Sequence, residues 1–184
     1  FRALTQSGRL RVRPVRNRMV IELPESVLFE SGHAEIKPEG VAVLRQVAQI
    51  LATIPNRDFM IAGHTDDRPI RTREFPSNWE LSSARAANVF KILRDNGVPQ
   101  RRLSVAGFAE FQPVGNNNTD EGRAQNRRIE IALMPNLEEL PDLSGLESAE
   151  QLPALEAAAE RSQRSLDLEQ GPLLRVIWFE LGKE

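Results

Sequence analysis

The run from Gly63 to Arg85 holds the side chains whose types and spacing best define a chemistry. Residues 59–62 form a short apolar stretch that predicts a strand, and Asp66 follows it in an acidic turn. A helix predicted to begin after Ser77 carries Arg85, whose side chain leans back toward the helix start. A carboxylate and a guanidinium facing each other across one crevice would bind a small zwitterion. Asp66 would take its ammonium group and Arg85 its carboxylate.

The same two side chains allow a second interpretation, a salt bridge between Asp66 and Arg85 that only braces the loop. Their spacing alone does not choose between the two. Two further features would suit a ligand without excluding the brace. Crevices at the carboxyl ends of strands are the usual binding sites of open α/β sheets. A helix start also offers free N–H groups and a positive potential to an anion.

Strands and helices are predicted to alternate along residues 1–134, and these elements must position the crevice. Alternating apolar residues predict strands at 10–12 and 19–23, with Pro14 and Asn17 in the turn between them. Residues 27–36 are expected to form a loop. Further elements are predicted as a helix at 38–54, the strand at 59–62, a helix from Ser77 to Gly97, a strand at 103–106, a short helix at 119–126 and a strand at 129–133. The pattern predicts an α/β, two-layer sandwich of helices on a sheet.

Length and composition limit the remaining function classes. The 184 residues suffice for one domain and an appendage, and 40% of them are apolar. Cysteine is absent, and no apolar run approaches the length that spans a bilayer. The chain begins with Phe1 rather than Met and shows no signal peptide, so we expect an excised fragment. Its arginines are not interleaved with aromatic residues, so no nucleic acid is expected as a partner.

Other chemistries have weaker support in the sequence. His64, Asp66 and Asp67 could ligate a metal, but the chain has only two histidines and the pattern is unspecific. A serine nucleophile lacks the G-x-S-x-G turn. We therefore expect no metal, no cofactor and no catalysis. A carboxylate pair suited to glycoside hydrolysis stays open as an alternative, because no particular pair stands out.

Four separated blocks of sequence resemble the OmpA/MotB-like family of peptidoglycan-binding domains. They are Gly63-His64-Thr65-Asp66; Asn78 with Leu81-Ser82 and Arg85-Ala86; Gly107-Phe108 with Pro113; and Asn117 with Arg123 and Asn126-Arg127-Arg128-Ile129-Glu130. The resemblance covers roughly residues 15–134. The insert at 68–76 and the words SNWELS are most similar to the flagellar-motor stator subunits of the MotB type.

This resemblance implies noncovalent binding of peptidoglycan through the diaminopimelate of its stem peptide. Asp66 and Arg85 would grip the ligand, with Thr65, Asn78 and Arg127 around them. It also implies a periplasmic domain of a cell-envelope protein that is anchored in the inner membrane if MotB-like, or in the outer membrane if a lipoprotein or OmpA-like. A weak homodimer and a stator partner, reached through a missing N-terminal membrane segment, are further implied. A cell-wall hydrolase and a non-catalytic dimerisation module are the alternatives.

The sequence changes character at Pro135. Basic side chains exceed acidic ones before it, and acidic side chains exceed basic ones after it. We predict an acidic linker at 135–148 and a tail at 149–184 with a helix and a strand. Residues 152–182 weakly resemble a fragment of a condensation domain of nonribosomal peptide synthetases, without that family's catalytic motif.

Overall fold

The computed structural model describes residues 2–15 and 18–134. The chain divides into two units, Phe1–Met134 and Pro135–Glu184, and all described elements belong to the first. The predicted linker at 135–148 and tail at 149–184 lie outside the described residues. Within the described part of the chain, no helix has the length and apolar character needed to cross a membrane.

The elements follow one another as the alternation predicts. In chain order they are α1 (Arg2–Gln6), β1 (Arg11–Val15), β2 (Arg18–Pro24), α2 (Glu25–Leu28), α3 (Pro38–Thr53), β3 (Phe59–His64), α4 (Asn78–Asp95), the 3-10 turn η1 (Gln100–Arg102), β4 (Leu103–Gly107), α5 (Asp120–Asn126) and β5 (Arg128–Leu133).

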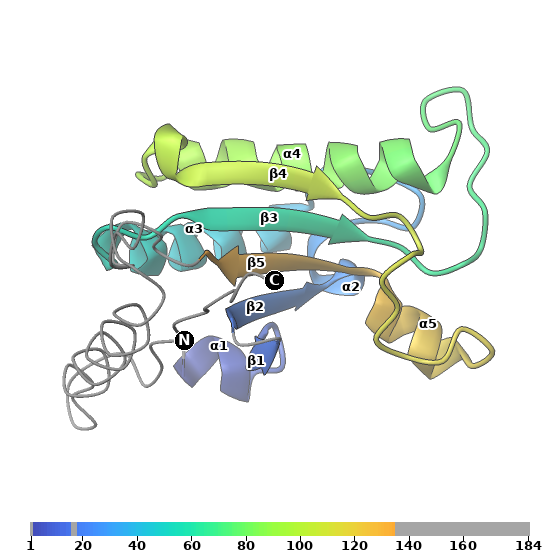
Figure 1. Cartoon of the computed structure of the whole chain (residues 1–184), viewed down its shortest axis with the longest axis horizontal. Coiled ribbons are helices and arrows are strands. Elements are labelled where there is room, and N and C mark those ends of the chain that lie inside the picture. The colour runs from blue at the N-terminus through green and yellow to red at the C-terminus, as the bar shows by residue number, and fades with distance from the viewer. Residues whose placement is uncertain (1, 16–17, 135–184) are drawn as a thin grey trace, which may run out of the picture. The chain divides into compact units, whose positions relative to one another are not determined.

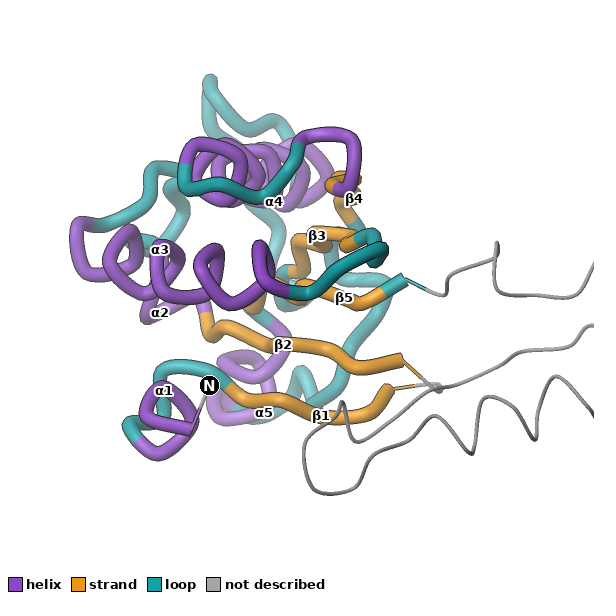
Figure 2. Tube along the Cα trace, turned by 90° about the vertical axis from the view of Figure 1, so that its left-hand side faces the viewer, coloured by secondary structure: helices purple, strands orange, loops and turns teal. Residues whose placement is uncertain are grey.

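The five strands form one sheet in the order β1-β2-β5-β3-β4. Strand β5 is antiparallel to both of its neighbours, so that Ile131 lies opposite Ile21 on one side and Ile61 on the other. Strands β3 and β4 are parallel. Helices α3 and α4 lie on the same face of the sheet (Figures 1 and 2). This arrangement confirms the predicted α/β fold with helices packed on a sheet.

The hydrophobic core fills the space between the sheet and the two long helices. It is built from buried aliphatic and aromatic side chains of both layers, among them Ile21, Leu44, Phe59, Val89 and Ile131. The helices contribute one apolar stripe each, and the strands contribute alternate residues. This core holds the ends of β3, α4 and β5 in fixed relative positions.

The start and the end of α4 match the signals in the sequence. The Ser77 hydroxyl accepts a hydrogen bond from the backbone N–H of Trp79 and contacts the Glu80 carboxylate. At the other end Gly97 adopts a left-handed φ of 99°, and the N–H of Val98 donates to the carbonyl of Leu93. These are the side-chain cap and glycine-terminated turn that close a helix at each end. Arg85 therefore lies in the first half of a helix whose start is fixed by the Ser77 cap.

Two local predictions differ from the structure. Residues 27–36 form the predicted loop except at its start, where Val27 and Leu28 belong to helix α2, and an isolated bridge joins Phe29 to Ile36. A four-residue helix is too short for apolar periodicity to reveal it. Pro14, predicted in the hairpin turn, lies within β1 opposite Met19. Strand β1 is an edge strand, where a proline that cannot donate a hydrogen bond is tolerated.

Candidate functional site

An unbroken chain of four charged side chains of alternating sign marks the candidate site. The Asp66 Oδ2 atom lies 2.6 Å from Nη1 of Arg127. The Nε atom of Arg127 lies 2.5 Å from Oε2 of Glu25, and Oε1 of Glu25 lies 2.5 Å from Nη2 of Arg85. Each of the two inner groups therefore contacts two opposite charges. The site holds two carboxylates and two guanidinium groups within reach of one another.

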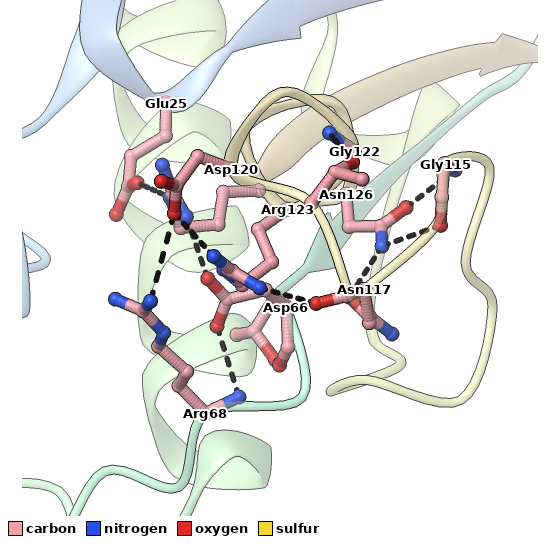
Figure 3. A network of polar contacts seen from close by, with 12 residues as sticks. Glu25, Asp66, Arg68, Gly115, Asn117, Asp120, Gly122, Arg123 and Asn126 are labelled. Carbon is pink, nitrogen blue, oxygen red and sulfur yellow. Dashed lines mark hydrogen bonds and ion pairs between the residues drawn. The ribbon is translucent and has the colours of Figure 1, made fainter.

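Four different elements supply these side chains. Asp66 follows β3, Glu25 is the first residue of α2, Arg85 lies in α4 and Arg127 links α5 to β5. Figure 3 shows Glu25 and Asp66 approaching the network from opposite sides. The central placement of β5 next to both β2 and β3 brings Arg127 to this edge of the sheet. The sheet order thus assembles the site from segments that are up to 102 residues apart.

Arg85 is enclosed by the segment that follows α2. Its side chain is only 3% exposed. Its Nε donates to the carbonyl of His33 at 2.8 Å, its Nη2 donates to the carbonyl of Glu30 at 3.3 Å, and the guanidinium lies 4.9 Å from the centre of the Phe29 ring. Burial lowers the pKa of Arg85, and the Glu25 carboxylate opposes that shift. An arginine keeps its charge even so, so Glu25 neutralises a buried cation.

Arg127 is the accessible member of the chain. Its side chain is 31% exposed, against 8% for Asp66 and 11% for Glu25. Burial acts to lower the pKa of Arg127, but the contacts with Asp66 and Glu25 outweigh it and raise that pKa. A ligand arriving from solvent would therefore meet Arg127 first.

Thr65 and Asn78 hold the backbone around Asp66. The Thr65 hydroxyl donates to the Asp66 carbonyl at 2.9 Å. The Asn78 amide nitrogen lies 3.4 Å from the same carbonyl, 3.1 Å from the Arg68 carbonyl and 3.2 Å from the Glu110 carboxylate. The backbone N–H of Arg68 in turn donates to Asp66 Oδ1 at 3.2 Å. These two predicted site residues therefore fix the loop that carries the Asp66 carboxylate.

The α5 side of the site is fastened by a second network. Oδ1 of the fully buried Asn126 accepts from the N–H of Val114 at 2.7 Å and of Gly115 at 2.8 Å. The Arg123 guanidinium contacts the Asn117 carbonyl and the Asp120 carboxylate (Figure 3). These contacts fix the segment from which Arg127 reaches into the site.

Two glycines allow α4 to lie close to the sheet. A Cβ at Gly63 would lie 2.1 Å from the carbonyl oxygen of Ser82, and one at Gly107 would lie 2.1 Å from the hydroxyl of Ser83. Only a residue without a side chain fits such a contact. The glycines of the Gly63 and Gly107 motifs therefore set the distance between Arg85 and the strand ends.

The five predicted site residues gather at this one end of the strands, but Asp66 and Arg85 do not pair as the salt-bridge interpretation predicted. Among the described residues, no ion pair joins Asp66 directly to Arg85, so the predicted Asp66–Arg85 brace is not formed. Glu25 and Arg127 lie between them. The sequence interpretation missed Glu25. The only local signal for Glu25 is its position directly after Pro24, which ends a strand, because acidic residues are common in the first turn of a helix.

The weaker candidates for chemistry lie elsewhere or in structural roles. Arg128 is buried and pairs with Glu130 at 2.8 Å, while His64 stacks on Phe108 with ring centroids 5.3 Å apart. In the part of the chain that the structure describes, no three His, Asp or Glu side chains form a set that could hold a metal ion.

Comparisons with known proteins identify relatives in sequence and in fold. The chain is 39% identical over 118 residues to motility protein B of Bacillus subtilis, which covers 64% of this chain and 45% of that protein. The solved cell wall anchor of the type VI secretion system of Pseudomonas aeruginosa is 33% identical, with a TM-score of 0.68 over 72% of this chain and 92% of that structure.

The periplasmic domain of Helicobacter pylori MotB is 27% identical, with a TM-score of 0.68 over 78% of this chain and 91% of that structure. The chain thus spans less than half of its full-length motility relative but nearly all of the solved domains. The model of the OmpA family matches residues 28–127, which include Asp66, Arg85 and Arg127. The chain belongs to the OmpA family.

Proposed function

We propose that this domain binds peptidoglycan noncovalently by gripping the zwitterionic end of diaminopimelate in the stem peptide. The observation that carries the proposal is the alternating chain Asp66–Arg127–Glu25–Arg85. Diaminopimelate ends in an ammonium group and a carboxylate on one carbon. Such a ligand matches one carboxylate and one guanidinium that are held a short distance apart.

Binding exchanges internal partners for those of the ligand. The ligand ammonium takes the place of Arg127 beside Asp66, and the ligand carboxylate takes the place of Glu25 beside Arg85. Glu25 and Arg127 keep each other as partners after the exchange. No charge is left unpaired in either state, which matters because an unpaired charge in a partly buried site is costly.

In this role the domain is a wall anchor in the periplasm and catalyses nothing. Support comes from the names of two similar structures, one a cell wall anchor and the other a periplasmic domain. The three similar proteins above are named for motility or anchoring rather than for an enzymatic reaction. A stator partner and a weak homodimer belong to the same proposal, by analogy with the motility proteins.

Incubation with purified sacculi tests the proposal. Wild-type protein should pellet with intact sacculi, and free diaminopimelate should release it. Asp66→Asn should stay in the supernatant, while Glu22→Gln, which removes a buried carboxylate paired with Arg13 at 2.6 Å, should pellet like wild type.

Two results would contradict the proposal. Release of soluble fragments by the wild-type protein would make it a hydrolase. Failure to pellet, together with dimerisation in sedimentation, would make it a dimerisation module.

A further inference from the structure

Two aromatic side chains beside the site stack on each other and remain exposed. The rings of Trp79 and Phe111 have centroids 5.3 Å apart and an interplanar angle of 22°. Trp79 is 48% exposed and Phe111 is 64% exposed. Large apolar rings are normally withdrawn from water, so a paired exposed set indicates a contact surface.

The structure holds this aromatic pair in a fixed position. The N–H of Phe111 donates to the carbonyl of Phe108 at 3.1 Å, which closes a turn. Ala109, which follows Phe108 in this turn, has hydrogen-bond partners for both of its backbone groups. Its carbonyl accepts from the N–H of Thr65 at 2.8 Å, and its N–H lies 3.2 Å from the Ser82 hydroxyl. Ala109 itself has a left-handed φ of 48°. The aromatic turn is thus bonded to the segment that carries Asp66 and to the helix that carries Arg85.

The pair also adjoins the site directly. Trp79 follows Asn78 in the chain, and Phe111 follows Glu110. The Asn78 amide contacts both the Asp66 carbonyl and the Glu110 carboxylate. A ligand that fills the ion-pair site would therefore extend next to the two rings.

We propose that Trp79 and Phe111 form a platform on which a sugar ring of the glycan strand stacks. This inference rests on the proposed function. Peptidoglycan stem peptides are attached to glycan sugars, so a bound peptide brings a sugar close to its binding site. A pyranose has one face of C–H groups and an edge of hydroxyl groups. The flat rings fit that face, and Glu110 and Asn78 supply polar groups at the rim.

The chemistry of the patch favours a sugar over a protein partner. A groove for an apolar helix would present several exposed aliphatic side chains. Among the described residues, the other exposed large hydrophobic side chains are only Val105 and Val114. Two stacked, nearly parallel rings with a carboxylate and an amide beside them suit a ligand that is apolar on its face and polar at its edge.

Binding of three defined ligands by the full chain tests the platform. They are the free stem tetrapeptide with diaminopimelate, the same peptide on its disaccharide, and glycan strands stripped of peptide. Wild type should bind the disaccharide-peptide about fivefold to tenfold more tightly than the free peptide, the range of one aromatic contact. Trp79→Ala and Phe111→Ala should lose that ratio and bind the free peptide like wild type.

Matched variants separate stacking from general apolarity. Trp79→Leu should lose the ratio, Trp79→Phe should retain most of it, and the distant Val105→Ala should leave it unchanged. Equal wild-type affinity for the peptide with and without sugar would overturn the platform, as would an unchanged ratio in Trp79→Ala. A shift from dimer to monomer in Trp79→Ala with no change in the ratio would assign the rings to a protein interface and also overturn it.

The stripped glycan strands distinguish the two proposals. If wild type binds neither peptide ligand, the proposed function fails. Trp79-dependent binding of the stripped strands would then still support the platform, and its absence would overturn the platform as well.

Discussion

The Glu25 carboxylate lies 2.5 Å from the Arg85 guanidinium, with both side chains almost completely buried. Glu25 therefore occupies the position in which a ligand carboxylate would meet Arg85. Under the proposed function, Glu25 is an internal substitute for the ligand carboxylate. Affinity then depends on how readily Glu25 gives up this contact, in addition to the contacts that the ligand gains.

Replacing Glu25 by Gln should tighten ligand binding and weaken the fold. The amide keeps the shape of the carboxylate but no longer competes as an anion for Arg85. We expect affinity for the stem tetrapeptide to rise about tenfold, within the range measured for close charge pairs. Loss of a buried ion-pair partner should cost roughly 3 kcal/mol of unfolding free energy. Calorimetric titration and urea unfolding measure the two effects.

Glu22→Gln is the control, because it removes a different buried carboxylate, which lies in β2 and pairs with Arg13. It should weaken the fold without changing peptide affinity. Weaker peptide binding by Glu25→Gln would show that Glu25 positions Arg85 for the ligand and does not compete with it.

Changing the residue at either end of the four-residue chain should strongly weaken peptide binding. Asp66→Asn leaves no anion for the ligand ammonium, and we expect a loss on the order of 2–4 kcal/mol in peptide binding. Arg85→Lys keeps a charge but cannot reproduce the contacts to Glu25 and to the carbonyls of Glu30 and His33. It should bind peptide poorly while retaining its circular dichroism spectrum. Wild-type affinity in both variants would reduce these residues to a structural role.

Gly63→Ala should destabilise the domain by separating α4 from the sheet. The added Cβ would lie 2.1 Å from the Ser82 carbonyl, a backbone atom that cannot move alone. We expect a loss of roughly 3 kcal/mol, the upper end of the typical range for overpacking, because the neighbouring atom belongs to the backbone. Thermal unfolding measures the effect, with the variant Ala62→Gly on the adjacent strand position as a milder comparison. An unchanged melting temperature would mean that the helix and strand are not held at this distance in solution.

Acid should remove the stabilisation that Glu130 contributes. Burial acts to raise the pKa of Glu130, but its interactions with His64 and Arg128 lower it from 4.5 to about 2. The Arg128 contact at 2.8 Å is the closer one, since His64 Nε2 lies 3.7 Å away, beyond hydrogen-bond distance. A carboxylate with a lowered folded pKa stabilises fully above its unfolded value and loses that effect as pH falls through its folded value.

Unfolding free energy should therefore decline from about pH 4.5 toward pH 2, by on the order of 2–3 kcal/mol from this group. Glu130→Gln should be less stable than wild type at pH 7 and should lose less stability across that interval. If the unfolding free energies of wild type and Glu130→Gln fell equally between pH 4.5 and pH 2, the loss could not be assigned to Glu130.

Histidine 64 should add a separate loss of stability between pH 7 and pH 5. Burial lowers the pKa of His64 from 6.5, partly opposed by Glu130 and reinforced by Arg128. The unfolded chain then binds a proton that the folded domain does not, so stability falls as pH drops below about 6.5. Neither ring nitrogen has a hydrogen-bond partner among the described residues. His64→Phe should keep the stack on Phe108, and its unfolding free energy should change less between pH 7 and pH 5 than that of wild type. An equally steep decline in both proteins would contradict the prediction.

The ends of the long helices and the position of β5 could be predicted from the sequence. Ser77, Gly97 and Pro38 are short-range signals that act on their own turn of helix, and the helix ends lie where these residues indicate. Alternation along 129–133 likewise marks β5. Helix α2 escapes such reasoning because four residues contain no full period of an apolar stripe.

The pairing within the site could not be predicted for a different reason. Asp66, Arg85 and Arg127 are identifiable from their types and motifs, but the partner of each depends on which strands are neighbours. Glu25 is 102 residues from Arg127 and meets it only because β5 pairs with β2. Long-range charge pairing follows from sheet order, and nothing local in the sequence encodes that order.

The central place of β5 also bears on how the domain is made. The ribosome releases β1, β2, β3 and β4 before β5, yet β5 must lie between β2 and β3. The nascent chain therefore exposes the unpaired edges of β2 and β3 until β5 emerges, a state prone to misassembly. Arg127 emerges at the same moment, so the sheet and the ligand site are completed together. A polypeptide terminated before Arg127 would lack both the central strand of the sheet and the inner guanidinium of the four-residue chain.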